Sequence, residues 1–155
     1  MNKNNELNVV MFCAAECERQ QSGERSVAKM FSAYLYAYHT IDVDGIESLN
    51  EPFIMTQFVN NVALLVDQRN VNGYRTTPVR FANFCFAINA CNIPFALNSL
   101  YNAYADQNVT TDEFVKEFLD VHPFVDGNGR TAAIIYNALN GTMDNPVTLP
   151  DYYGG

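Results

Sequence analysis

Apolar residues recur at three- and four-residue spacing along most of the chain, which is the pattern of helices that bury one face. Residues 26–40 show it most clearly, at Val27, Met30, Phe31, Tyr34, Leu35 and Tyr38. A second such helix is expected to begin near Asn50, with Pro52 in its first turn, and to end before Gly73. This periodicity predicts an all-α fold.

Helix signals continue through the second half of the chain. Pro94 opens an apolar-faced segment, and Thr110 and its two neighbours offer N-caps for a helix that runs through Leu119. Good helix formers follow Arg130, and Gly141 is a suitable C-terminal stop. The sequence HPFVDGNGR, residues 122–130, is therefore expected to join two helices.

Three segments have other patterns. Residues 73–84 mix β-branched and aromatic residues with a proline, which predicts a short edge hairpin or an extended loop. Residues 7–16 are apolar but carry too little positive charge for a signal peptide, so we expect a buried amphipathic first helix. His39 is expected to end a helix and to contact its terminal carbonyls.

Length and charge narrow the class of protein. The 155 residues, 48% of them hydrophobic, fit one folded domain spanning residues 1–155, without a repeat or linker. The formal charge of −8 disfavours nucleic acid and anionic lipid as partners. No apolar run approaches the ~20 residues that cross a bilayer, so no membrane association is expected.

The four cysteines form two pairs, Cys13 with Cys17 and Cys85 with Cys91, and neither has the spacing of a zinc knuckle. We expect buried free thiols, which fit a reducing cytoplasm.

The composition of residues 122–130 suggests an anion site. Gly127 and Gly129 let a backbone approach an oxyanion closely and permit the positive φ angles of an anion-binding nest. Asn128 can donate from its side chain to the same oxygens, and Arg130 adds a fork of donors suited to phosphate. The N-terminus of the following helix contributes unpaired N–H groups and the positive end of its dipole.

Two further residues of this stretch carry reactive groups. His122 can take up a proton near neutral pH, and Asp126 is a hard oxygen ligand suited to Mg²⁺ that is held mainly by substrate phosphates. Phe124 is expected to point inward and fix the loop to the core. This set of residues fits phosphoryl or nucleotidyl transfer, although Asp126 and Asn128 could instead satisfy backbone groups of the turn.

At these residues the chain resembles the Fic/Doc family, whose hallmark is H-x-F-x-[DE]-G-N-G-R followed by x-x-R. Every fixed position through Arg130 matches. Upstream, NGYRTTPV is similar to the family's flap, a β-hairpin that aligns a segment of the target protein. The resemblance covers about residues 50–140 and implies a Fic-type helical bundle with a short β-hairpin flap. The flap's target-positioning residues would be Gly73, Tyr74, Arg75 and Thr76.

The resemblance implies transfer of AMP from ATP to a Tyr, Thr or Ser hydroxyl of a target protein. His122 would deprotonate that hydroxyl, and Asp126 would hold the Mg²⁺ that bridges the phosphates. Asn128 and the amides of the flanking glycines, 127 and 129, would stabilise charge on the α-phosphate, and Arg130 would bind the β-phosphate.

One position departs from the family pattern, because Ala133 stands where the final arginine of the motif would fall. Losing that contact would weaken ATP binding by about 10- to 100-fold. Our hypothesis is that Arg75, Arg80 or Lys116 replaces it, or that the donor is not a triphosphate.

Other readings stay open beside AMP transfer. The chain could be a binding protein that keeps the Fic fold, or a transferase with a different phosphate-containing donor, such as a phosphotransferase like the Doc branch. The family's inhibitory helix has no full match; the nearest is Thr40 to Gly45. A separate antitoxin-like protein could therefore restrain the activity. A toxin-like protein in a bacterial cytoplasm, or in a host cytoplasm if phage-encoded, suits the short chain.

Overall fold

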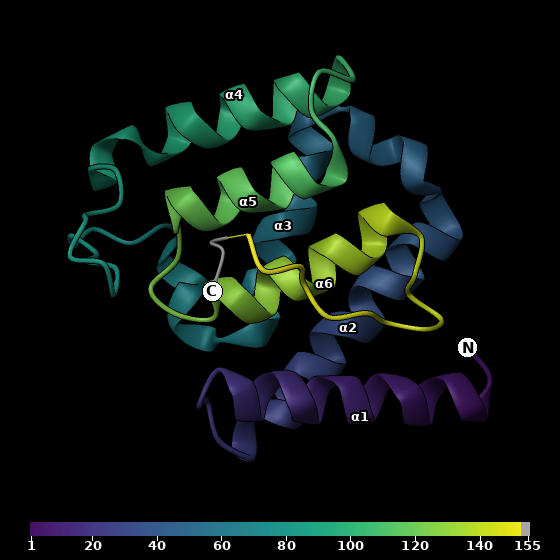
Figure 1. Cartoon of the computed structure of the whole chain (residues 1–155). Coiled ribbons are helices and arrows are strands. Elements are labelled where there is room, and N and C mark those ends of the chain that lie inside the picture. The colour runs from purple at the N-terminus through teal and green to yellow at the C-terminus, as the bar shows by residue number, and fades with distance from the viewer. Residues whose placement is uncertain (153–155) are drawn as a thin grey trace.

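The computed structural model describes residues 1–152, which form six α-helices and three short 3₁₀ helices (Figure 1). In chain order the elements are α1 (Lys3–Arg19), α2 (Arg25–Asp44), η1 (Ile46–Asn50), α3 (Pro52–Val66), η2 (Gln68–Asn72), η3 (Ala90–Asn92), α4 (Ile93–Ala105), α5 (Thr111–Val121) and α6 (Asn128–Asn140). The described residues contain no β-strand. The all-α prediction is confirmed.

Helix α6 lies at the centre of the bundle, where it packs against α2, α3 and α5 (Figure 1). Every residue from Arg130 to Ala138 is buried, including Thr131 and Asn137. A helix that is buried on all sides has no solvent face to supply polar periodicity. The start of α6, which carries the motif, is therefore fixed by the core of the molecule.

The sequence signals for α5 and for the end of α6 are confirmed. Thr110 caps α5 in a capping box with Glu113: the Thr110 hydroxyl accepts from the Glu113 N–H, and the Glu113 carboxylate accepts from the Thr110 N–H. Helix α5 ends at His122, whose left-handed backbone (φ 51°) turns the chain into the motif loop. Gly141 ends α6, also in the left-handed region.

The predicted β-hairpin flap is not formed. Residues 73–89 run as two irregular arms that share one isolated antiparallel bridge, between Arg80 and Phe86. The Ala87 N–H donates to the Val79 carbonyl and the Phe81 N–H to the Cys85 carbonyl, so pairing is limited to the tip of the segment. Nearer the bundle the arms separate, and the first is tied to the motif loop instead.

Two smaller predictions are corrected. Helix α2 continues to Asp44, so His39 lies within a helix and does not end it. Cys13 and Cys17 are buried free thiols as expected, but Cys85 and Cys91 are exposed because they lie in the irregular segment and in η3. Burial raises the pKa of Cys13 to about 12, so this thiol is protonated near neutral pH.

Within residues 1–152, the search for a helix of the length and apolar character needed to cross a bilayer finds none.

Candidate active site

The motif loop, residues 122–127, is held against the end of α3 by one buried amide. Asn70 in η2 donates from Nδ2 to the Ala63 carbonyl and to the Asp126 carbonyl, both at 3.0 Å. Its Oδ1 accepts from the Val125 N–H at 3.2 Å. On the other side of the loop, Phe124 is buried against Tyr74, and the two ring centroids lie 5.6 Å apart. The predicted inward position of Phe124 is confirmed. The loop is thus rigidly positioned.

The side chain of Asn128 is used inside the loop. Its Oδ1 accepts from the Phe124 N–H at 2.9 Å, and its Nδ2 donates to the Phe124 carbonyl at 3.0 Å. This reciprocal pair satisfies both backbone groups of a buried residue. The geometry therefore favours the backbone-satisfying alternative for this side chain, and leaves backbone N–H groups as the donors toward an anion.

The two glycines of the motif differ in their backbone conformation. Gly127 has φ +76°, and a Cβ there would lie 2.7 Å from Cγ1 of Val66. Gly129 is helical, which corrects the expectation of a positive φ at both positions. A Cβ at 129 would lie 2.5 Å from Oε1 of Gln20, at the end of α1. The Gln20 side chain thus lies against the first turn of α6.

The start of α6 has the properties of an anion site. Gly127 caps the helix without a side-chain hydrogen bond to its first N–H groups. Arg130 in the first turn is only 4% exposed, and its Nε atom is buried without a hydrogen-bond partner within residues 1–152. An unpartnered buried guanidinium nitrogen is costly unless a ligand completes it. N–H groups that the N-cap residue leaves uncapped and a buried positive charge meet at one helix end.

Asp126 lies between two arginines. Its Oδ2 accepts from Nη2 of Arg69 at 2.6 Å, and its Oδ1 lies 3.7 Å from Nη2 of Arg130 and accepts from the Gly127 N–H at 2.7 Å. Arg69 also pairs with Asp67, and these hydrogen bonds lower the pKa of Asp67. The Asp126 side chain is 52% exposed, so a metal ion can reach it.

Asp126 is the residue of the motif loop that could hold a metal ion. Residues 1–152 contain no cluster of three or more His, Cys, Asp or Glu side chains able to hold a metal ion. Asp126 supplies one accessible carboxylate beside the anion site. That donor set suits Mg²⁺, which in phosphate-transferring sites is held by one or two carboxylates and by the phosphates of the substrate.

His122 lies at the entrance of the same loop, half-buried, with the ring of Phe81 5.6 Å away in an edge-on arrangement. Burial lowers its pKa, and the positive charge of Arg75 lowers it further; a backbone hydrogen bond at Leu119 and the charge of Asp126 oppose these effects. The imidazole is therefore neutral at pH 7, which is the form that can accept a proton.

Arg75 is a structural residue and not a free phosphate ligand. It is 2% exposed, and its guanidinium donates to the carbonyls of His122 (2.6 Å), Thr77 (3.0 Å), Ile88 (2.8 Å) and Val121 (3.1 Å). Its backbone N–H donates to the Pro123 carbonyl at 2.8 Å. One side chain therefore ties both arms of the irregular segment to the C-terminal end of α5 and the start of the motif loop.

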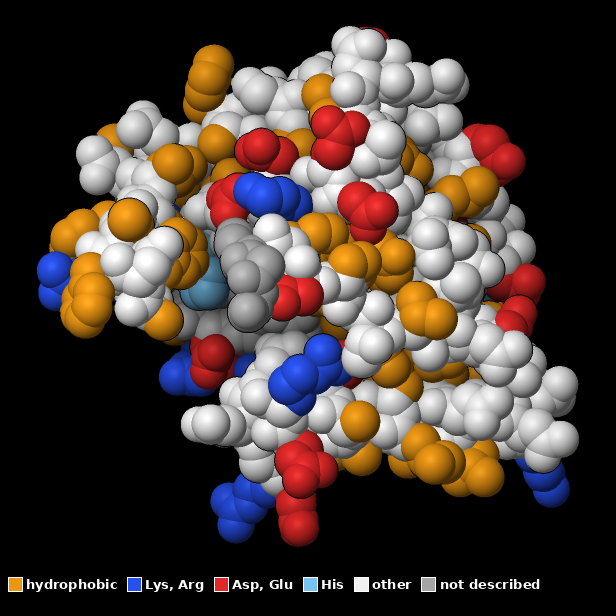
Figure 2. Space-filling view, viewed as in Figure 1, with side chains coloured by type: hydrophobic (Ala, Val, Ile, Leu, Met, Phe, Trp, Pro, Cys, Tyr) orange, Lys and Arg blue, Asp and Glu red, His pale blue; other side chains and the backbone are white. Residues whose placement is uncertain are grey.

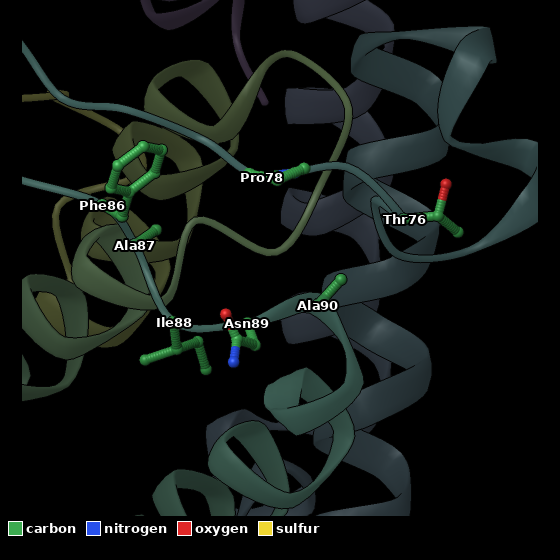
Figure 3. A pocket seen from close by; sticks show the side chains of 7 residues that line it. All are labelled: Thr76, Pro78, Phe86, Ala87, Ile88, Asn89 and Ala90. Atoms are coloured by element: carbon green, nitrogen blue, oxygen red, sulfur yellow. The ribbon is translucent and has the colours of Figure 1, made fainter.

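The irregular segment presents an apolar surface with one exposed arginine. Phe84 and Phe86 are 74% and 63% exposed, and the Arg80 guanidinium lies over both rings, 5.4 and 5.2 Å from their centroids. Figure 2 shows hydrophobic side chains gathered around a basic one over this protruding segment. Between the arms lies a pocket of about 310 Å³, with Thr76 and Pro78 from the first arm and Phe86 to Ala90 from the second (Figure 3).

The substitutes considered for the missing arginine have other contacts. Arg75 is bound to carbonyls, Arg80 stacks on phenylalanines, and Lys116 pairs with Asp120 one turn further along α5. Ala133 itself is fully buried in α6. An arginine at position 133 would therefore overpack the core around α6.

Sequence patterns did not indicate four residues at this site: Gln20, Asp67, Arg69 and Asn70. Gln20 and Asp67 cap the C-terminal ends of α1 and α3, and the other two lie in η2, in short polar stretches without periodicity that are far from the motif in sequence. Only the tertiary fold brings them to the loop.

Comparison with known proteins agrees with this geometry. The model of the Fic/DOC family matches residues 40–139, which is more than half of the chain and includes the whole motif. A ribonucleoside-diphosphate reductase small chain of Ostreid herpesvirus 1 (isolate France) is 46% identical over 39 residues, 25% of this chain. The chain spans only 7% of that viral protein's length. No solved structure matches the chain. The motif at the α5–α6 junction and the family match together show that this protein belongs to the Fic/DOC family.

Proposed function

We propose that this protein transfers AMP from Mg²⁺-bound ATP to a Tyr, Thr or Ser hydroxyl of a target protein. One observation carries the proposal: the complete HPFVDGNGR sequence folds into a loop that joins a neutral histidine to a helix N-terminus with free N–H groups and a buried arginine. A phosphate bound at that helix end and a hydroxyl beside His122 would meet within one short loop.

The chain's residues would act as follows. His122 accepts the proton of the attacking hydroxyl through a ring nitrogen, and its lowered pKa favours the neutral form that this step requires. The N–H groups at the start of α6 stabilise the charge that develops on the α-phosphate oxygens, and Arg130 binds the β-phosphate. The hydroxyl oxygen bonds to the α-phosphorus as the bond to pyrophosphate breaks.

Asp126 is the residue that would hold Mg²⁺. The bound ion would neutralise phosphate charge and so favour departure of pyrophosphate. Asp126 must first release Arg69 from Oδ2, while its Oδ1 can keep the Gly127 N–H.

The irregular segment, residues 73–89, is the proposed contact surface for the target protein. Its exposed phenylalanines and the pocket between its arms suit an apolar side chain of a polypeptide. Arg75 fixes this surface relative to His122, because the same guanidinium binds carbonyls of both. The target hydroxyl would thereby be placed at the catalytic base.

A binding protein that retains the fold is the alternative, and the absence of an arginine at position 133 favours it. Catalysis and binding differ in one testable respect, because only an enzyme makes a covalent product.

Labelled ATP tests the proposal. The protein and its His122→Ala variant would be incubated in a cell lysate with Mg²⁺ and ATP labelled at either the α- or the γ-phosphate. We expect α-label, but no γ-label, on a protein band, and loss of that label with the variant. Transfer of the γ-label would instead indicate a phosphotransferase. Absence of label from both donors, with ATP still bound, would indicate a binding protein.

A further inference from the structure

We infer that Arg69 is a donor-binding residue, which holds Asp126 in the free protein and binds the terminal phosphate of the donor once Asp126 has taken up its metal ion. The inference rests on the proposed function and assigns to Arg69 the phosphate contact that the chain lacks at position 133.

The contacts of Arg69 fit both states. Its Nε donates to Oδ1 of Asp67 at 3.1 Å, and its Nη2 donates to Oδ2 of the same carboxylate at 2.8 Å. This two-pronged pair fixes the plane of the guanidinium without help from Asp126. Release of Asp126 would therefore leave Arg69 held by Asp67, with one of the two N–H groups of Nη2 freed toward the site.

The position of Arg69 places it beside the anion site. The Asp126 carboxylate contacts Nη2 of Arg69 through one oxygen and the Gly127 N–H through the other, at 2.6 and 2.7 Å. Only the width of a carboxylate thus separates Arg69 from the start of α6. A donor phosphate bound beside Asp126 would lie within reach of the Arg69 side chain, which is 62% exposed.

Charge balance gives the exchange a physical reason. In the free protein, the carboxylates of Asp67 and Asp126 face the guanidinium groups of Arg69 and Arg130, so the four charges cancel. If Asp126 held a divalent ion, its carboxylate would attract Arg69 less strongly. The arriving phosphates then offer negative charge to the released guanidinium.

Nucleotide titration calorimetry tests the inference in the His122→Ala background, where the donor is not consumed. Arg69→Ala is compared with Arg25→Ala, a matched loss of an exposed arginine at the start of α2, outside the motif loop and the irregular segment. With Mg²⁺ present, we expect Arg69→Ala to weaken ATP binding by about 10- to 100-fold, the effect of one charge-assisted contact, and to leave AMP binding unchanged. Arg25→Ala should change neither, and Arg69→Lys should recover part of the ATP affinity.

The outcomes distinguish a failure of the role assigned to Arg69 from a failure of the proposed AMP transfer. Equal losses for ATP and AMP would show that Arg69 only maintains the loop, and unchanged ATP binding would show that it makes no donor contact; either result overturns the inference while the proposed function stands. If the His122→Ala protein binds no nucleotide, the proposed function fails and the role of Arg69 fails with it. Thermal melting of each variant excludes unfolding as the cause of a lost signal.

Discussion

At the residue scale, the environment of His122 favours the neutral form of its imidazole. It ends α5 in a left-handed conformation, lies edge-on to Phe81, and has the buried charge of Arg75 nearby. Burial and the nearby cation both penalise the protonated ring, whereas Asp126 favours it, and the net effect is a lowered pKa. Burial is the largest cause of the lowered pKa, and the charge of Arg75 adds to it.

The lowered pKa of His122 determines how the rate of transfer should depend on pH. As pH falls, His122 with a lowered pKa stays neutral longer than an ordinary histidine, so activity is lost only when pH drops through the lowered value. We expect the acid limb of kcat/KM, measured between about pH 5 and 8, to lie below the ordinary histidine pKa of about 6.5. An acid limb at or above that value would contradict the assigned environment of His122.

At the element scale, the motif loop is held between the ends of α1, α3, α5 and α6. Gly127 packs against Val66 at the end of α3, and Gly129 faces Gln20 at the end of α1. The first contact is with a branched side chain in the core, while the second is with the far end of a flexible one. The two glycines should therefore differ in their tolerance of a methyl group.

Paired alanine substitutions measure this difference. Gly127→Ala combines a positive φ with a clash against Val66 and should lower the free energy of unfolding by about 2 kcal/mol or more. Gly129→Ala meets only the Gln20 amide and gains helix propensity, so it should stay within about 1 kcal/mol of the unsubstituted protein. Denaturant unfolding gives both values, and equal losses would contradict the contacts described. Gly129→Ala combined with Gln20→Ala removes the remaining contact and is the control.

The sequence predicted the helices because the residues that form them repeat with a helical period and carry caps such as Thr110 and Gly141. For residues 73–84 it allowed either a hairpin or an extended loop, and the hairpin was wrong, since strand-like composition does not reveal that the Arg75 side chain ties the first arm to the motif loop. The motif located the site, but not its contacts. The sequence did not predict that the Asn128 side chain bonds the Phe124 backbone or that Arg69 bonds Asp126. Both contacts depend on how α3 and α6 pack.

At the scale of the whole molecule, charge is unevenly distributed. The chain carries −8 overall, yet residues 68–105 contain no Asp or Glu and have three arginines, Arg69, Arg75 and Arg80. This stretch includes the irregular segment and one side of the motif loop. A phosphate-bearing donor and a target polypeptide would both approach a part of the surface that the excess negative charge elsewhere does not oppose.

We propose that the motif makes the protein a nucleotidyltransferase, and the masses of the reacted proteins would show whether it does. The unsubstituted protein and the His122→Ala variant would each be incubated with Mg²⁺ and ATP, alone and with lysate. The masses of the intact proteins and of their peptides would then be measured by mass spectrometry. We expect a mass gain of one AMP on a Tyr, Thr or Ser side chain, and we expect no such gain with the His122→Ala variant. An AMP gain that persists with His122→Ala, or no covalent product from a protein that binds ATP, would contradict it.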